Sequence, residues 1–241
     1  MINKSRKNHM KKIQISLFIL SICLAITGMT YPADRTTKKY DYKDFSKVEA
    51  GSGMLVKISQ SLSYSIEINA EEEDFEYLKV EKNGNSLQIY IDKNNYRKHG
   101  DIRVDIQMPA LTGLDLSGGA QGKLSMDIKD NFDCDLSGGA EISGNLMCEN
   151  INLEISGGSI INLSGKGTDL TAEASGGSVY HLKDFSVKDV NTDLSGGSRL
   201  EINMNGTLNV DASGGSKVVY YGNAKLGSTD FSGGSGISQG E

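Results

Sequence analysis

Leu114-Asp115-Leu116-Ser117-Gly118-Gly119-Ala120 is the stretch that decides the fold, because its Ser-Gly-Gly centre occurs seven times in the chain. The triplets begin at Ser117, Ser137, Ser156, Ser175, Ser195, Ser213 and Ser232, at intervals of 20, 19, 19, 20, 18 and 19 residues. Similarity at a nearly fixed period of this size is typical of stacked structural repeats. Of the 29 glycines among the 241 residues, 24 lie from Gly113 onward, so the glycine excess belongs to the repeat.

The positions around each triplet repeat as well. An apolar residue always precedes the serine, and the residue before that one is always acidic. The acidic series is Asp115, Asp135, Glu154, Glu173, Asp193, Asp211 and Asp230. The residue after the two glycines is always Ala or Ser, and an apolar residue lies five positions past the first serine in six of the seven copies.

This pattern predicts an all-β fold, a single-stranded parallel β-helix (β-solenoid) with one coil of about 19 residues per repeat. Glycine enters positive φ freely, so the paired glycines are expected at a corner of each coil. The apolar residue before the corner should face inward and the acidic residue outward, and stacked serine hydroxyls could bind the corner amides. Hexapeptide helices and calcium-binding nonapeptide rolls do not fit intervals of 18 to 20 residues.

Three segments are expected along the chain. Residues 1–30 contain five basic residues and then an uncharged apolar run, which is typical of a secretory signal peptide with an uncertain cleavage point. Residues 34–112 show short alternating runs with a turn at Asn83-Gly84-Asn85, which predicts an irregular β lead-in and N-terminal cap. Glu71 to Tyr77 is the one stretch with helical character, and residues 113–241 form the solenoid with its seven repeats.

The leader predicts export. Cys23 lies in the leader and leaves lipid attachment open, while Cys134 and Cys148 could form a disulfide or remain buried thiols. The net charge of −6, with pI 5.2, disfavours a nucleic-acid partner.

The chain resembles the putative auto-transporter adhesin family with a head GIN domain, from about Phe45 to its C-terminus. The lead-in Phe45-Ser46-Lys47-Val48, the strands up to Met108-Pro109 and the Ser-Gly-Gly corners carry the resemblance. It implies a parallel β-helix in an exported protein of a Gram-negative bacterium, placed in the periplasm, in the outer membrane or at the cell surface. The family pattern defines corners and core, so it transfers no catalytic or ligand-binding residues.

The acidic series is the most specific chemical feature. Carboxylates stacked one strand apart repel one another, so solvent, a bound cation or a basic partner must compensate. As candidate cation ligands we take the seven acidic residues Asp115, Asp135, Glu154, Glu173, Asp193, Asp211 and Asp230, although no chelating loop accompanies them. No catalytic residue, cofactor site or established metal site is predicted.

Three other features are weaker. His99 lies in a polar basic loop that could be a binding tip, and His181 is expected to be an outward strand residue. Tyr220 and Tyr221, with Tyr180, could form an exposed aromatic strip or be divided between core and surface.

We therefore expect an exported, adhesin-like and non-enzymatic β-solenoid that binds an unknown surface ligand, either a glycan or a protein. The alternatives are a polysaccharide-active β-helix enzyme and a Ca²⁺-stabilised structural envelope protein. The final coil near Phe231 to Ser238 is expected to be an open end, through which a homo-oligomer could form.

Overall fold

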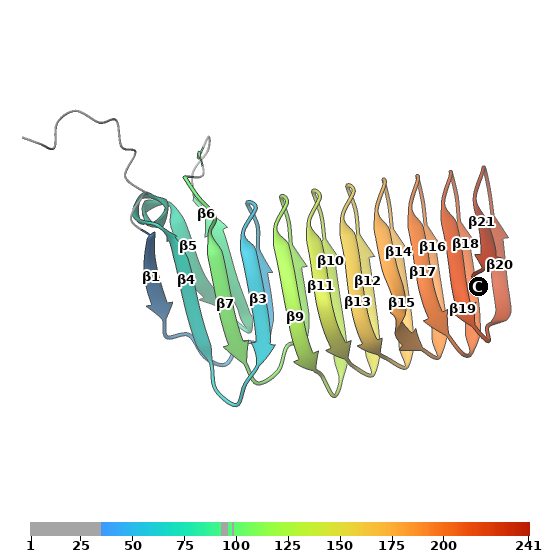
Figure 1. Cartoon of the computed structure of the whole chain (residues 1–241), viewed down its shortest axis with the longest axis horizontal. Coiled ribbons are helices and arrows are strands. Elements are labelled where there is room, and N and C mark those ends of the chain that lie inside the picture. The colour runs from blue at the N-terminus through green and yellow to red at the C-terminus, as the bar shows by residue number, and fades with distance from the viewer. Residues whose placement is uncertain (1–34, 93–95, 98) are drawn as a thin grey trace, which may run out of the picture. The chain divides into compact units, whose positions relative to one another are not determined.

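The computed structural model describes residues 35–92, 96–97 and 99–241, which form two sheets of stacked strands (Figure 1). The predicted signal peptide and Cys23 lie outside the described residues. Each coil of the repeat contributes one strand to each sheet, and the Ser-Gly-Gly corner joins the two strands. The predicted β-solenoid is confirmed, with two strands per coil.

Sheet A has eleven strands. In spatial order they are β1 (Arg35–Tyr40), β4 (Ser65–Glu71), β7 (Arg103–Met108), β3 (Leu55–Gln60), β9 (Gln121–Asp127), β11 (Glu141–Met147), β13 (Ile160–Lys166), β15 (Val179–Val187), β17 (Arg199–Met204), β19 (Lys217–Gly222) and β21 (Gly236–Gln239).

Sheet B has ten strands. In spatial order they are β20 (Lys225–Phe231), β18 (Thr207–Ala212), β16 (Asp189–Leu194), β14 (Asp169–Ala174), β12 (Asn150–Ile155), β10 (Asn131–Leu136), β8 (Gly113–Leu116), β2 (Lys47–Ala50), β6 (Ser86–Ile91) and β5 (Leu78–Asn83).

The core lies between the two sheets and follows the alternation of the sequence. In β10 and β14 every second residue is buried, and the residues between them are exposed. Side chains of a strand alternate between its two faces, so each strand supplies one apolar row to the interior. Phe132 and Phe185 are among the largest buried side chains, and Tyr180 is fully buried as well. The buried Tyr180 hydroxyl donates a hydrogen bond to the Leu153 carbonyl oxygen at 2.7 Å.

The corners confirm the expected role of the first glycine of each triplet, whose φ is positive in all seven copies. The second glycine behaves differently along the chain, because its φ is positive at Gly119, Gly139 and Gly158 but not in the last four corners. Positive φ at both central residues is the pattern of a type I′ turn, and at the first alone that of a type II′ turn. The corner thus changes its turn type after the third copy.

This change extends the hydrogen bonding between coils. In the last three corners the second glycine donates its N–H to the first glycine of the preceding coil, for example from Gly197 to the Gly176 oxygen at 2.7 Å. The ladder between neighbouring coils therefore continues through the corner itself.

The corner serines do not act as predicted. The hydroxyl expected to bind corner amides was that of the first serine, but the serine after the glycines has the recurring role. Its buried hydroxyl donates to the carbonyl oxygen of the first serine, as Ser178 does to Ser175 at 2.8 Å. The same bond recurs at Ser159, Ser198, Ser216 and Ser235. A buried hydroxyl needs a partner, and this local bond supplies it.

Both sheets continue to the N-terminal side of residue 113. Strand β2 pairs in parallel with β8, and β3 pairs in parallel with β9, so the segment from β2 to β3 is stacked as a coil in register with the repeat. Its corner is Gly51-Ser52-Gly53, where Ser52 and Gly53 have positive φ. Glu49 and Ala50 precede this corner, in the places of the acidic and apolar residues of the repeat.

The N-terminal end of the solenoid is covered by antiparallel strands. Strand β4 pairs antiparallel with β7 and β1, and β5 pairs antiparallel with β6. A short 3₁₀ helix, η1 (Glu72–Glu76), joins β4 to β5, which agrees with the helical character expected there. The C-terminal end differs, because β20 and β21 are the last strands of sheets B and A and all seven residues of β20 are exposed.

Two smaller points concern the cysteines and membrane helices. Cys134 is buried in β10, Cys148 is half-buried after β11, and both are free thiols rather than a disulfide. Burial raises the pKa of Cys148 to about 12. Within the described ranges, no helix is long and apolar enough to span a membrane.

Gly144 tests how closely the coils are stacked. Its φ is +148°, and a Cβ at this position would overlap the Leu124 carbonyl oxygen of the preceding coil. Backbone cannot easily move aside, so Gly144→Ala should lower the free energy of unfolding by about 2 kcal/mol or more. Urea denaturation measures this change. The matched control is Gly177→Ala, which meets no atom within 4 Å and should change stability by less than about 0.5 kcal/mol. Equal effects of the two variants would contradict the close stacking.

Candidate functional site

The acidic residues of the repeat form one straight column on the outer face of sheet B. Strand register places each carboxylate directly beside the next, from Asp115 beside Asp135 to Asp211 beside Asp230. Parallel strands lie about 4.8 Å apart, which sets the spacing of the column. The prediction that these residues point outward, next to an inward apolar neighbour, is confirmed in β10, where Asp135 is exposed and Leu136 buried.

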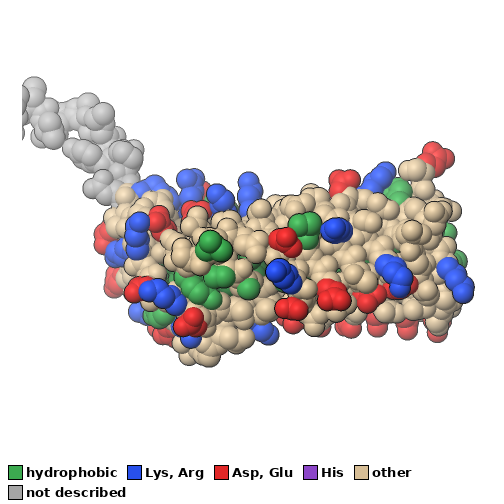
Figure 2. Space-filling view, turned by 90° about the horizontal axis from the view of Figure 1, so that it is seen from below, with side chains coloured by type: hydrophobic (Ala, Val, Ile, Leu, Met, Phe, Trp, Pro, Cys, Tyr) green, Lys and Arg blue, Asp and Glu red, His purple; other side chains and the backbone are tan. Residues whose placement is uncertain are grey.

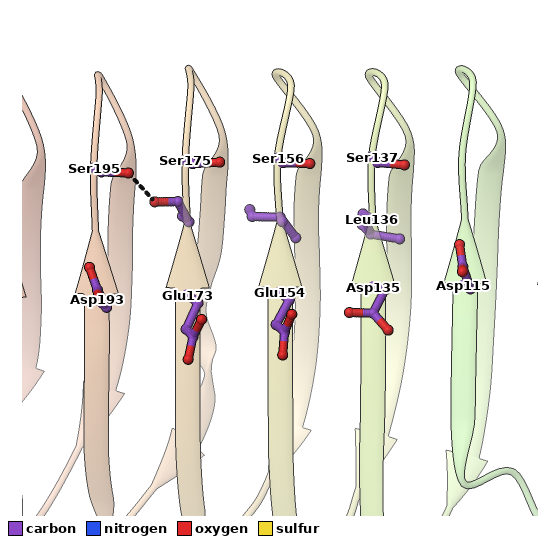
Figure 3. Close-up of a pocket in the computed structure, with 12 residues that line it drawn as sticks. Asp115, Asp135, Leu136, Ser137, Glu154, Ser156, Glu173, Ser175, Asp193 and Ser195 are labelled. Atoms are coloured by element: carbon purple, nitrogen blue, oxygen red, sulfur yellow. Dashed lines mark hydrogen bonds between the residues drawn. The ribbon is translucent and has the colours of Figure 1, made fainter.

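A shallow groove runs along this column beside the corners. One part, of about 370 Å³, is lined by five of the carboxylates and by corner serines, among them Ser137, Ser156 and Ser195. Figure 3 shows the carboxylates from Asp115 to Asp193 in a row, and above them the corner serines from Ser137 to Ser195. A second part of about 370 Å³ continues along the column to Asp230. We call this surface the acidic groove.

The two faces of the repeat differ in charge. The strands of sheet B from β8 to β20 contain ten acidic residues and one basic residue, Lys225. The strands of sheet A from β9 to β21 contain four acidic and five basic residues. Figure 2 shows acidic side chains in a row along the lower rim of the molecule, while basic side chains gather toward its N-terminal end.

Ionisation is disfavoured at two carboxylates of the column, Asp115 and Asp135. Burial, followed by the negative charge of Glu49, raises the pKa of Asp115. Burial, followed by the charges of Glu154, Asp115 and Asp133, raises the pKa of Asp135. Among the described residues, no salt bridge within 4.0 Å reaches any of the seven carboxylates of the repeat.

The column has an eighth member that the sequence analysis missed. Glu49 pairs in register with Asp115, and its two carboxylate oxygens accept hydrogen bonds from Ser86 at 2.5 Å and Gln88 at 2.8 Å. The column therefore ends at the N-terminal cap in a hydrogen-bonded carboxylate. The signal was present in Glu49-Ala50-Gly51-Ser52-Gly53, but the altered order of glycine and serine hid it.

The column does not resemble a metal cage. Ca²⁺ takes six to eight oxygen ligands arranged around it, whereas these carboxylates lie along a line. Within the part of the chain that the structure describes, no group of three or more His, Cys, Asp or Glu side chains could hold a metal ion. Cation binding at the seven candidate residues remains a prediction that the geometry does not favour.

His99 belongs to a second polar cluster, at the N-terminal cap. Asp74 of η1 is fully buried, and its Oδ1 lies 2.7 Å from His99 Nδ1 and accepts a short hydrogen bond from the Tyr96 hydroxyl. Burial, followed by the Asp74 carboxylate, raises the pKa of Tyr96. Among the described residues, none forms a hydrogen bond with Asp74 Oδ2. These hydrogen bonds join the segment that follows β6 to η1.

The remaining candidates separate into surface and core. His181 is an outward residue of β15, as predicted, and its Nδ1 lies 3.5 Å from Glu201 Oε2. Tyr180 is buried, so the possibility of an exposed strip that includes it was wrong. Tyr220 packs partly against the core, and the ring of Tyr221 lies 4.1 Å from Lys183 Nζ.

Removing charge from the column should stabilise the protein at neutral pH. Asp115 and Asp135 have raised pKa values in the folded state, so the folded protein binds their protons more tightly than the unfolded chain does. Stability from these groups is present below the unfolded pKa and is lost as pH rises through the folded pKa. Because both groups are largely solvated, Asp115→Asn with Asp135→Asn should raise the free energy of unfolding at pH 7 by only about 0.2–1 kcal/mol per residue.

Thermal melts at pH 3 to 8 measure this effect. The stability of the double variant relative to the parent should increase as pH rises through the carboxylate range, because only the parent loses the contribution of Asp115 and Asp135. Asp127→Asn, outside the column, is the control and should follow the parent. A double variant less stable than the parent at pH 7 would show that the carboxylates do not repel one another in the folded state.

Several solved structures have the same fold as this protein. No curated protein matches the chain in sequence. The structure of a protein from Bacteroides fragilis described as a putative adhesin is similar over 86% of this chain and 97% of its own length, with a TM-score of 0.80 and 19% identity. Two further structures share the fold. One is described as a putative adhesin from Parabacteroides merdae (87% and 98% covered, TM-score 0.69, 17% identity), and the other as a putative lipid-binding protein from Parabacteroides distasonis (87% and 98% covered, TM-score 0.70, 14% identity).

At these identities the structural likeness shows the fold alone, but the sequence family is matched directly. The model of the family described as "Putative auto-transporter adhesin, head GIN domain" matches residues 44–224, which is most of the chain. This agrees with the resemblance carried by the Ser-Gly-Gly corners. The protein therefore belongs to this family, the head GIN domain family of putative auto-transporter adhesins.

Proposed function

We propose that the protein is an exported, non-enzymatic binding module of the cell envelope, and that the acidic groove is its binding face. The observation that carries this proposal is the charge difference between the two faces of the repeat. Ten acidic residues and one basic residue lie in the strands of sheet B from β8 to β20, and no salt bridge within 4.0 Å joins a described basic side chain to the seven carboxylates of the repeat.

Such a face favours a basic partner. Oppositely charged surfaces steer association and select the partner, and the gain falls with ionic strength. The carboxylates repeat at one strand spacing along at least six coils, so the groove offers many equivalent contacts rather than one site. Repetition of this kind suits an extended ligand that touches several coils, and we propose a basic protein segment as that ligand.

The same repetition supports a non-catalytic role. General acid–base catalysis needs side chains with distinct environments placed around one reacting atom. The groove instead presents carboxylates and serines that recur from coil to coil. The alternative function, a polysaccharide-active enzyme, would require an acidic or basic group in the groove whose surroundings differ from those of its equivalents in the other coils.

The binding experiment compares two variants of equal net charge. Glu173→Gln with Asp193→Asn removes two charges at the centre of the groove, and Asp127→Asn with Glu149→Gln removes two charges outside it. Surface plasmon resonance against an immobilised lysine-rich peptide should show at least a tenfold weaker affinity for the first variant, and little change for the second. Equal losses would mean that net charge alone drives binding, and the groove would be rejected as the site.

Two further measurements test the rest of the proposal. Protease added to intact cells should cleave the protein if it lies at the surface, whereas protection until the outer membrane is opened would exclude an adhesin role. Incubation with polysaccharides should release no reducing sugar. Release that is lost in Glu173→Gln with Asp193→Asn would favour the enzyme instead.

A further inference from the structure

The two ends of the solenoid are finished in different ways. At the N-terminal end the outermost strand of sheet A, β1, carries Arg35, Lys38 and Lys39 and no acidic residue. The outermost strand of sheet B there, β5, carries two lysines, Lys79 and Lys82, and one acidic residue, Glu81. Lysines on an edge strand discourage another strand from pairing with it, because their charges would be desolvated or brought together.

The C-terminal edge of sheet B lacks this protection. Strand β20 carries one residue of each sign, Lys225 and Asp230, and every residue of the strand is exposed. Leu226 and Phe231 are 46% and 37% exposed, and among the described residues only two other large hydrophobic side chains are exposed. They continue the inward rows of the solenoid, since they pair in register with the buried Leu208 and Ala212 of β18. The apolar interior of the solenoid is thus open at this end.

We propose that β20 is a homodimer interface, in which β20 of a second copy pairs with it in antiparallel orientation across a two-fold axis. A symmetric interface requires a surface that is complementary to itself. Strand β20 meets this requirement in both charge and hydrophobicity, because its two ends carry opposite charges on one face and apolar side chains on the other.

One register of the two antiparallel β20 strands brings together both the opposite charges and the apolar side chains. The strand has a bulge at Gly227 and Ser228, where the ladder to β18 shifts, and these two residues occupy one position. With Thr229 on the two-fold axis, Leu226 lies opposite Phe231 of the second copy, and all of these residues are on the inward face. Lys225 is then the diagonal neighbour of Asp230 of the second copy, within reach of a long side chain. The four exposed apolar side chains of the two strands cover one another.

This pairing continues sheet B from one copy into the next. Inward faces meet inward faces, so the acidic columns of both copies lie on the same side of the joined sheet. The lysine-bearing edges β1 and β5 become the two outer ends of the dimer, where they oppose further growth. The dimer depends on β20 alone and does not depend on the ligand proposed for the acidic groove.

The first experiment measures mass by size-exclusion chromatography with light scattering across a concentration series. The parent should be a dimer at about 100 µM, a concentration that fills an interface of micromolar affinity. Lys225→Asp, and separately Asp230→Lys, should weaken the dimer at least tenfold, because each places like charges together. The double variant with both changes should recover it. Lys217→Asp, the same substitution on β19, is the control and should remain dimeric.

The second experiment tests the register. Thr229→Cys places two thiols opposite each other at the two-fold axis, within the Cα separation that a disulfide allows. Oxidation should therefore link two chains of this variant, but neither the parent nor Thr207→Cys, one coil further inside. A single-chain mass at every concentration would overturn the proposal. A dimer that tolerates Lys225→Asp, or in which Thr229→Cys does not cross-link, would place the interface elsewhere and would equally overturn it.

Discussion

The in-register stacking of coils, through backbone hydrogen bonds along the row of coils, is the constraint on which the rest of the structure depends. Each residue of a coil lies beside its equivalent in the next, as Cys134 beside Leu153 and Asp135 beside Glu154 show in β10 and β12. Every choice of side chain is therefore repeated at one strand spacing, whether it is favourable or not. Apolar rows gain from this repetition, because each coil covers the core of its neighbour. Carboxylate rows are destabilised by the same repetition, because like charges lie side by side.

Stacking also explains why the corner sequence varies so little. The first corner glycine lies directly against the preceding coil, and a Cβ on Gly196 would approach the Gly176 oxygen to 2.6 Å. The residue after the two glycines is Ala or Ser in every copy and is buried in the first six. Where this residue is Ser, its hydroxyl donates a hydrogen bond to the carbonyl oxygen of the first serine of the same corner, as Ser198 does to Ser195. The buried hydroxyl therefore has a hydrogen-bond partner. The corner sequence is thus limited mainly by the short distance between the backbones of neighbouring coils.

Much of this architecture could be predicted from the sequence, because seven near-identical copies show which positions share an environment. The parts that escaped prediction are those without a copy. The corner at Gly51 was missed since its serine and glycine exchange places, although its backbone has the same positive φ values. Asp74 and His99 are 25 residues apart, with the β5–β6 hairpin between them, so no local sequence pattern indicates their contact. The acidic column was visible, but its extension to Glu49 required the register of β2 with β8.

The direction of the hydrogen bonds has a mechanical consequence. In both sheets the bonds between coils point along the row of coils, so a force applied along that row pulls each ladder open rather than sliding its strands past each other. Ladders loaded in this way yield one after another, and each coil that detaches releases about 19 residues of extended chain. The antiparallel strands at the N-terminal end tie several segments together, while the last coil is held by β18 and β19 alone. Under tension the protein would therefore lengthen in steps from its C-terminal end, absorbing load while the earlier coils keep their surface intact.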